Sequence, residues 1–263
     1  MVERHSPDTH HITNNDICHK AKKILRGLEK ADHEAYLVGG AVRDLLLDKK
    51  PKDFDIATSA LPEEVKQTFG SSCRLIGRRF RLAHVHFGRE YLEVATFRAP
   101  HDDDESGKMS NDGRIIHDNV YGTLEEDAER RDFTINALFY DLKTGDVLDH
   151  VNGMDDIEAC QLRLIGDPET RYREDPVRML RAIRFACKLG FSIHSESETP
   201  IYSLGHLLKD IAPARLFDET LKLFHGGQAL ETFRALRKYN LFRYLFPLTE
   251  HSLLLEDGTE FLD

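Results

Sequence analysis

Two aspartates carry the clearest chemical signal in this sequence. Asp53 and Asp55 lie in Lys-Asp-Phe-Asp-Ile-Ala, whose alternation predicts a strand over 52–57 with both carboxylates on one face and Phe54 and Ile56 facing a core. Two neighbouring carboxylates repel each other unless a cation lies between them, and hard oxygen ligands favour magnesium. The pair therefore predicts a metal site for two-metal phosphoryl transfer, although Asp-x-Asp also occurs at ordinary solvated strand ends.

A pair of glycines precedes the aspartates and must be positioned with them. Gly39 and Gly40 join a short apolar run at 36–38, which predicts a strand, to residues 41–47, whose composition favours a helix. The first backbone N–H groups of a helix are unpaired and carry partial positive charge. We therefore expect the turn to hold a triphosphate, with Arg43 close by as a full positive charge.

A third carboxylate would complete the metal site, and the sequence offers two. Glu93 lies in the apolar segment 91–98, which predicts a strand beside the aspartates, but it is equally compatible with an ordinary outward-facing residue. Asp132 follows Arg130 and Arg131 and precedes an apolar run. This pattern predicts a helix whose polar edge faces a cleft.

These segments together resemble the class II nucleotidyltransferases of the polymerase-beta superfamily, which include CCA-adding enzymes and bacterial poly(A) polymerases. The resemblance covers about residues 35–247 and implies an α/β head with a mixed sheet, followed by an all-α neck. Gly-Gly-x-x-Arg-Asp and Asp-x-Asp imply triphosphate and metal binding by Gly39, Gly40, Arg43, Asp53 and Asp55. Arg-Arg-Asp implies ribose recognition by Arg130, Arg131 and Asp132.

The motif Glu-Asp-x-x-Arg implies that Glu174, Asp175 and Arg178 contact the incoming base. The residues themselves allow this role, because Glu174, Arg178 and Arg181 have the i, i+4, i+7 spacing of one helix face and could offer acceptors and donors to a base edge. The same spacing also fits a simple salt bridge on a solvated helix.

A basic segment decides the subtype within the family. Arg78, Arg79 and Arg81 lie in Leu-Ile-Gly-Arg-Arg-Phe-Arg-Leu-Ala-His-Val, which resembles the bacterial poly(A) polymerase branch. We expect these arginines to crowd a turn between strands and neutralise RNA phosphates. A solvated basic hairpin is the alternative.

The resemblance implies template-independent addition of AMP from ATP to RNA 3′ ends, in polyadenylation, mRNA processing and mRNA decay. The expected cofactor is Mg2+, held as two ions by Asp53 and Asp55 with Glu93, and the expected partners are ATP and an RNA 3′ end. Two alternatives stay open: a CCA-adding tRNA nucleotidyltransferase, and an RNA-binding fragment with impaired catalysis.

Composition is compatible with an intracellular enzyme. The chain has 263 residues, 40% of them hydrophobic, without an apolar run of membrane-spanning length. Its four cysteines form no Cys-x-x-Cys pair, so we expect neither a zinc site nor a disulfide framework. We expect the protein to act in a reducing cytoplasm. The net charge of −10 weakens nonspecific RNA affinity but allows a local basic track.

Changes of pattern along the chain predict four regions: a disordered lead-in (1–16), a catalytic head (17–150), a helical neck (151–250) and a truncated end (251–263). Apolar periodicity predicts helices over 17–31 and from 177 to Gly190, and another starting at Pro213. By the family resemblance, Arg215 and Glu219 in the last of these brace the base-reading helix.

Overall fold

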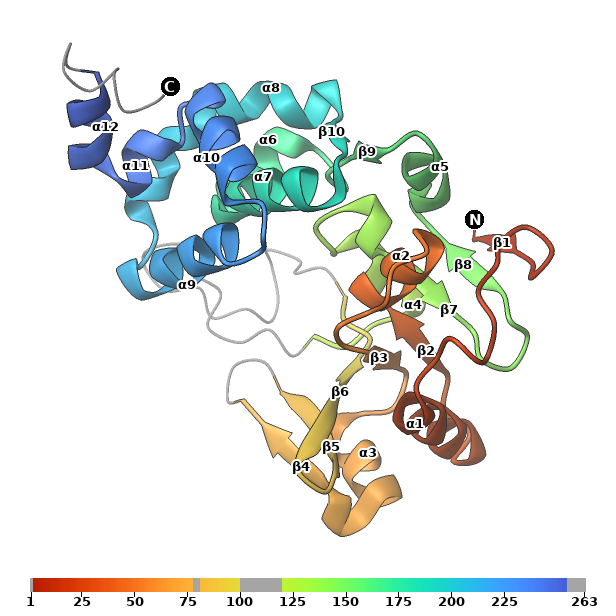
Figure 1. Cartoon of the computed structure of the whole chain (residues 1–263). Coiled ribbons are helices and arrows are strands. Elements are labelled where there is room, and N and C mark those ends of the chain that lie inside the picture. Colours follow the sequence, from red (N-terminus) through yellow and green to blue (C-terminus); the bar gives the residue numbers. More distant parts are fainter. Residues whose placement is uncertain (1, 78–80, 100–119, 255–263) are drawn as a thin grey trace. The chain divides into compact units, whose positions relative to one another are not determined.

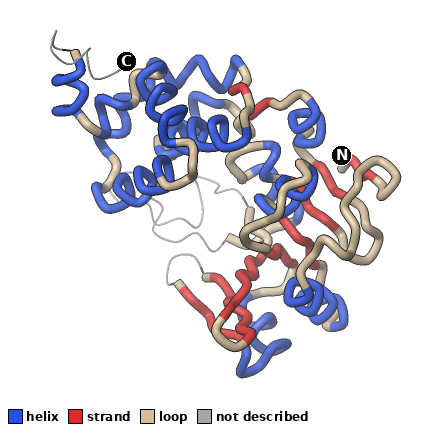
Figure 2. The backbone as a smooth tube through the Cα atoms, viewed as in Figure 1, coloured by secondary structure: helices blue, strands red, loops and turns tan. Residues whose placement is uncertain are grey.

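The computed structural model describes residues 2–77, 81–99 and 120–254. The chain divides into two compact units, Met1–Ile157 and Glu158–Asp263. Strands are concentrated in the first unit, whereas the second is almost entirely helical (Figure 2). The predicted order of an α/β head with a mixed sheet and a helical neck is therefore confirmed.

The head is built on one mixed sheet of eight strands (Figure 1). In spatial order they are β1 (Glu3–His5), β8 (Val147–Asp149), β7 (Leu138–Tyr140), β2 (Ala35–Val38), β3 (Asp55–Thr58), β6 (Glu90–Thr96), β5 (Leu82–Phe87) and β4 (Cys73–Ile76). All neighbouring strands are antiparallel except β3 and β6, which run parallel. A parallel pair needs a crossover connection, and here the intervening segment supplies α3, β4 and β5.

The head helices are α1 (His19–Lys30), α2 (Gly40–Leu46), α3 (Pro62–Phe69), α4 (Leu124–Glu129) and α5 (Gly153–Glu158), with short 3-10 turns η1 (Gly70–Ser72) and η2 (Thr134–Asn136). Sequence signals set their starts. Pro62 opens α3, as predicted, and the Glu64 carboxylate accepts a hydrogen bond from the Leu61 N–H at 2.7 Å.

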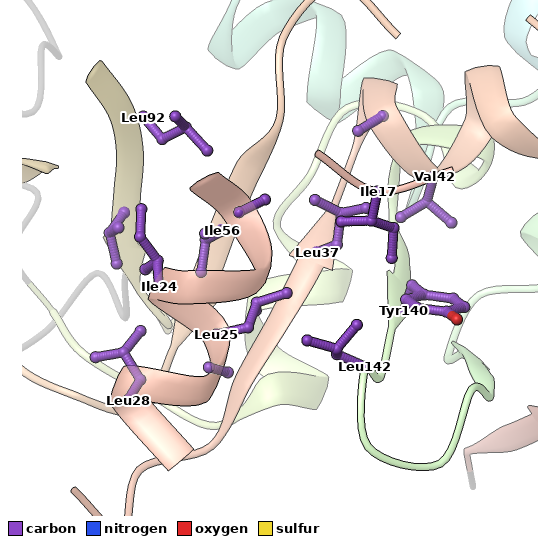
Figure 3. Packing of buried hydrophobic residues seen from close by; sticks show 14 of the residues in the cluster. Ile17, Ile24, Leu25, Leu28, Leu37, Val42, Ile56, Leu92, Tyr140 and Leu142 are labelled. Atoms are coloured by element: carbon purple, nitrogen blue, oxygen red, sulfur yellow. The ribbon is translucent and has the colours of Figure 1, made fainter. Parts of the chain in front are cut away.

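One face of the sheet is buried against α1. Ile24, Leu25 and Leu28 share one side of this helix and are fully buried, as their spacing predicts, in a cluster that includes Leu37 and Ile56 from the strands (Figure 3). Burying such side chains contributes about 1.5–3 kcal/mol each. On β3, β6, β5 and β4, several of the residues that alternate with this core and lie on the opposite face are polar.

The N-terminal segment 1–16, predicted to be disordered, forms ordered structure in its described residues. Glu3–His5 pairs with β8 as an antiparallel edge strand, and Ile12 is buried in the head core. Backbone pairing needs no apolar pattern, because N–H and C=O groups at a sheet edge pair with any extended segment.

The second unit contains α6 (Pro168–Glu174), α7 (Val177–Leu189), α8 (Ser195–Leu204), η3 (Gly205–Asp210), α9 (Pro213–Phe224), α10 (Ala229–Lys238), α11 (Phe242–Leu245) and α12 (Pro247–Leu253). The predicted helix after residue 177 is confirmed, with Val177, Leu180 and Ile183 buried and Gly190 ending it at φ 76°. A two-residue parallel pair, β9 (Gln161–Leu162) and β10 (Ser192–Ile193), adds a small sheet to the expected all-α neck.

Across the ranges that the structure describes, none of the helices combines the length and the apolar character needed to span a bilayer.

Candidate active site

The carboxylates predicted to bind metal lie on, or just before, the neighbouring parallel strands β3 and β6. Asp55 is the first residue of β3, and Asp53 precedes the strand, which begins three residues later than the predicted 52–57. Ile56 is in register with Val94 in the parallel pair, so Asp55 and Glu93 occupy neighbouring positions on the face opposite the core. The structure therefore places Glu93 on the strand next to Asp55, where the sequence predicted it.

The three carboxylates influence one another electrostatically. Although part of Asp55 is open to solvent, partial desolvation and then the negative charges of Glu93 and Asp53 raise its pKa to about 6, while Arg131 opposes the shift. A carboxylate whose pKa is raised by neighbouring negative charges favours a bound cation, and an all-oxygen set suits a hard one. Among the described residues no group of three or more Asp, Glu, His or Cys side chains is arranged to hold a metal ion by itself.

Next to Asp55, the chain makes the predicted glycine turn. Val38, the last residue of β2, is in register with Asp55, and Gly39 follows with φ 73°, in the region that strongly favours glycine. A Cβ on Gly39 would lie 3.6 Å from Nη1 of Arg131. This is an ordinary contact distance, so the positive φ rather than a lack of space favours glycine here, and Arg131 lies close to the turn. The helix that follows, α2, is only seven residues long.

The sequence predicts Arg43 as a full positive charge close to the bound phosphates, but in the structure its guanidinium is paired inside the head. Its side chain is buried, with Nε and Nη2 donating to Oδ1 of Asp44 at 2.9 and 2.6 Å. Its Nη1 donates to Oδ1 of Asn136 at 2.5 Å. Motif spacing cannot show the contact with Asn136, which is 93 positions away in sequence. Arg43 thus anchors α2 from inside the head.

The Arg-Arg-Asp motif lies in a turn between α4 and η2, so the prediction of a helix here is wrong. Asp132 Oδ1 accepts hydrogen bonds from the Phe133 N–H at 2.8 Å and from Nδ2 of Asn136 at 3.2 Å. Such local side-chain bonding competes with helix formation. Asn136, which sequence reasoning missed, therefore contacts both Arg43 and Asp132; its only signal was its place four residues after the motif.

The two arginines of the motif are held differently. Arg131 donates to Oδ2 of Asp127 at 2.7 and 3.2 Å, and its guanidinium lies 5.2 Å from the centre of the Phe139 ring. Arg130 ends α4 and is partly buried. The ion pair and the ring fix the direction of Arg131 beside Gly39, where it presents positive charge to the carboxylates.

The predicted basic turn is described only in part. Arg78 and Arg79 lie outside the described residues. Arg81 precedes β5, and its half-exposed side chain forms an ion pair with Glu63 at 2.5 Å.

In the second unit, the predicted base-reading residues come together across a helix break. Asp175 is extended, and Pro176 follows it, so Glu174 ends α6 whereas Arg178 and Arg181 lie in α7. The single helix face predicted from the i, i+4, i+7 spacing is therefore wrong. Arg178 nevertheless donates to Oε2 of Glu174 at 2.8 Å, while the Arg181 guanidinium lies 5.3 Å from the Phe185 ring centre.

The helix break is braced by α9, as the family resemblance implied. Nη2 of Arg215 donates to Oδ2 of Asp175 at 2.7 Å. Glu219, one turn further along α9, is buried and pairs with Lys222 at 2.7 Å. The acidic pair at the break is thus oriented by three arginines, since Arg171 and Arg178 both donate to Glu174 and Arg215 donates to Asp175.

Comparisons with known families match both units. Residues 35–163 match the family described as the poly A polymerase head domain, and residues 190–253 match the one described as a probable RNA and SrmB-binding site of polymerase A. The chain belongs to the nucleotidyltransferase family of poly(A) polymerases and CCA-adding enzymes.

Both branches of this family are represented among the similar proteins. Poly(A) polymerase I of Haemophilus influenzae is 55% identical over 90% of this chain and 53% of the relative. The CCA-adding enzyme of Lactobacillus helveticus is 42% identical over 83% of this chain and 53% of the relative. This chain therefore spans about half the length of the curated relatives it matches.

A solved structure from the same family has a similar fold. The Bacillus stearothermophilus CCA-adding enzyme in complex with CTP has a TM-score of 0.71 and 36% identity, over 84% of this chain and 52% of that chain. The higher identity to the poly(A) polymerase agrees with the branch predicted from the basic segment.

Proposed function

We propose that this chain is the head and neck of an RNA nucleotidyltransferase that adds AMP from ATP to RNA 3′ ends without a template, in polyadenylation and mRNA decay. The observation that carries the proposal is the meeting of Asp53, Asp55 and Glu93 beside the glycine turn and Arg131. Identity to poly(A) polymerase I favours ATP as the nucleotide.

The donor set fits Mg2+. Asp53 and Asp55, with Glu93, would hold it through hard carboxylate oxygens. The elevated pKa of Asp55 supports this, because a bound cation would offset the neighbouring negative charges that raise that pKa. Mg2+ is usually bound by one or two carboxylates together with substrate phosphate oxygens, so the phosphates of the nucleotide would supply further ligands. When bound, the metal would stabilise negative charge during phosphoryl transfer.

The chain's own residues bind and orient the two substrates. The turn at Gly39 and Gly40 allows phosphates to approach the backbone closely, and Arg131 offers them positive charge, as does Arg130. Asp132, held by Asn136, would orient the ribose and the primer end. The RNA 3′ oxygen then bonds to the α-phosphorus of ATP, the bond to the β-phosphate oxygen breaks, and pyrophosphate leaves together with the hydroxyl proton. Arg43 would act indirectly, by anchoring α2.

Selection of adenine is assigned to the second unit. Glu174, Asp175 and Arg178 would bind the base edge, with Arg181 on the same helix as Arg178, and the ion pairs to Arg178 and Arg215 would hold the carboxylates in orientation. Arg78, Arg79 and Arg81 would contact RNA phosphates. All four cysteines are unpaired, which supports a reducing cytoplasm as the place of action.

Addition of CCA to tRNA is the second candidate, favoured by the similarity to CCA-adding enzymes in sequence and fold. Primer extension on short RNA with magnesium, each nucleoside triphosphate being supplied separately, tests both. An oligo(A) ladder from ATP alone supports polyadenylation, whereas CTP followed by ATP incorporation on tRNA lacking its end moves the assignment to CCA addition. If no nucleotide is incorporated, the result favours the third reading, an RNA-binding fragment with impaired catalysis.

A matched pair of variants tests the site. Asp53→Asn should abolish incorporation, whereas Asp48→Asn, which changes a highly exposed carboxylate five positions earlier, should not. Activity retained by Asp53→Asn contradicts the assignment.

A further inference from the structure

A row of polar side chains continues from the carboxylates across the sheet. Arg74 of β4 is in register with His84 of β5, His84 is in register with Glu93 of β6, and Glu93 neighbours Asp55 of β3. All four lie on the face opposite the core, since Ile56 and the other residues that alternate with them are buried. The candidate active site is thus one end of a longer surface strip.

An aromatic stack stands in this strip. The rings of His84 and Tyr91 are stacked, with centroids 4.2 Å apart and an interplanar angle of 9°, and the His86 ring lies 5.6 Å from Tyr91. Nε2 of His84 is 3.5 Å from Oε1 of Glu93. Tyr91 is 49% exposed although its ring is held by two imidazoles. A fixed, open aromatic ring is a suitable surface for a planar ligand.

Charge along the strip changes from one end to the other. Asp53, Asp55 and Glu93 make the β3 and β6 end acidic, whereas Arg74 lies at the β4 end. Arg74 is exposed and forms no ion pair or hydrogen bond with the other described residues. A ligand that combines a planar group with a phosphate would match Tyr91 and Arg74 together.

The sheet order separates two substrate positions. The glycine turn follows β2 on one side of Asp55, whereas His84 and Tyr91 lie on β5 and β6 on its other side. Tyr91 is two residues from Glu93 on one strand, which is about 7 Å. A triphosphate at the turn and a nucleic-acid strand on the stack would therefore reach the carboxylates from opposite directions.

We propose that Tyr91, stacked on His84, is a platform for an unpaired nucleobase near the 3′ end of the RNA primer, and that Arg74 binds a phosphate of the same strand. This inference rests on the proposed function and adds a binding site for the RNA. Stacking on an aromatic ring tolerates any base, because every base has a π-face, and this suits an enzyme that extends varied 3′ ends.

Two variants at one position isolate the ring. Tyr91→Leu removes the aromatic surface and keeps apolar bulk on the strand, while Tyr91→Phe keeps the ring; both lose the hydroxyl. We expect the Kd for fluorescein-labelled oligo(A), measured by anisotropy without ATP, and the KM for primer to rise about tenfold in Tyr91→Leu. The KM for ATP and kcat at saturating primer should stay unchanged, and Tyr91→Phe should behave as wild type.

Other outcomes overturn the proposal. Unchanged primer binding in a folded Tyr91→Leu protein excludes the platform, and a raised KM for ATP alone means that the ring serves the incoming nucleotide. Arg74→Gln should weaken oligo(A) binding and lower the slope of log Kd against log salt concentration by about 0.7, as for one lost phosphate contact on a single strand. An unchanged slope removes Arg74 from the site. Absence of extension by the wild type, with oligo(A) binding still sensitive to Tyr91, would refute the proposed function and leave the platform standing.

Discussion

Arg43 donates a 2.5 Å hydrogen bond to Asn136, a residue 93 positions later in the chain, and both side chains are buried. The same asparagine donates to Asp132. The glycine turn that leads into α2 and the Arg-Arg-Asp turn are thereby joined behind the candidate active site, so a change in either is transmitted to the other.

Replacing Arg43 by Met should lower the free energy of unfolding of the head by about 3 kcal/mol, because Asp44 would be left as a buried charge without its partner. Urea denaturation followed by circular dichroism measures the change. Arg4→Ala is the control, since its ion pair with Asp146 is exposed on the arginine side and should be worth less than about 1 kcal/mol. Equal effects of the two substitutions would contradict the buried role of Arg43.

Asp55→Asn should stabilise the metal-free protein at pH 7 while abolishing nucleotide transfer. The folded-state pKa of about 6 lies above the ordinary 3.8, so the ionised carboxylate destabilises the folded state. This cost is absent below pH 4, grows between pH 4 and pH 6 and is complete above pH 6. Allowing for solvent screening at a partly exposed group, we expect a gain of about 1 kcal/mol.

Melting temperatures of wild type and Asp55→Asn in EDTA, from pH 7 down to pH 4.5, provide the measurement. The advantage of the variant should shrink as the pH falls. An advantage that is constant with pH would show that the charge of Asp55 is not its source.

Mg2+ should raise the Tm of the wild type, because a ligand that binds only the folded state stabilises it, by about 2.7 kcal/mol at a hundredfold excess over Kd. Asp53→Asn should remove most of this shift. Asp48→Asn, with its exposed carboxylate, should keep it. If all three proteins respond equally in a thermal-shift titration, the metal binds elsewhere.

Arg215→Ala should reduce the preference for ATP over CTP, by about tenfold in the ratio of kcat/KM, because Asp175 loses the hydrogen bond that orients it. Stability should change little, since Arg215 is half-exposed. Arg173→Ala, which removes an exposed pair with Glu169 in the neighbouring helix, is the matched control. Selectivity that is lost equally in both variants would indicate a general disturbance of α6.

Local patterns predicted much of the secondary structure. The apolar spacing of α1 and α7 and the prolines that open α3 and α9 gave helices close to the observed ones, because periodicity and helix ends are recorded in neighbouring residues. The same holds for Asp55 and Glu93, since alternation within each strand fixes the face on which each carboxylate lies.

Features that depend on distant partners could not be predicted in this way. The hydrogen bond from Arg43 to Asn136 is not visible in local sequence because the two residues are 93 positions apart. Strand β1 is not predicted because its backbone pairs with β8 without an apolar pattern. The helix break at Asp175 does have a sequence signal, because a proline follows it and disfavours helical backbone. The i, i+4, i+7 spacing points instead to one continuous helix, and that prediction is wrong.

The order of strands also affects how the protein is made. β2 pairs with β3 on one side, but its other partner, β7, is about 100 residues further along the chain, which takes a ribosome roughly 5–20 s to synthesise. Until then the apolar edge of β2 has unpaired N–H and C=O groups and can pair with other chains. The half-synthesised head is therefore the stage most prone to aggregation, and slower translation of the segment between β3 and β7 would lengthen that exposure.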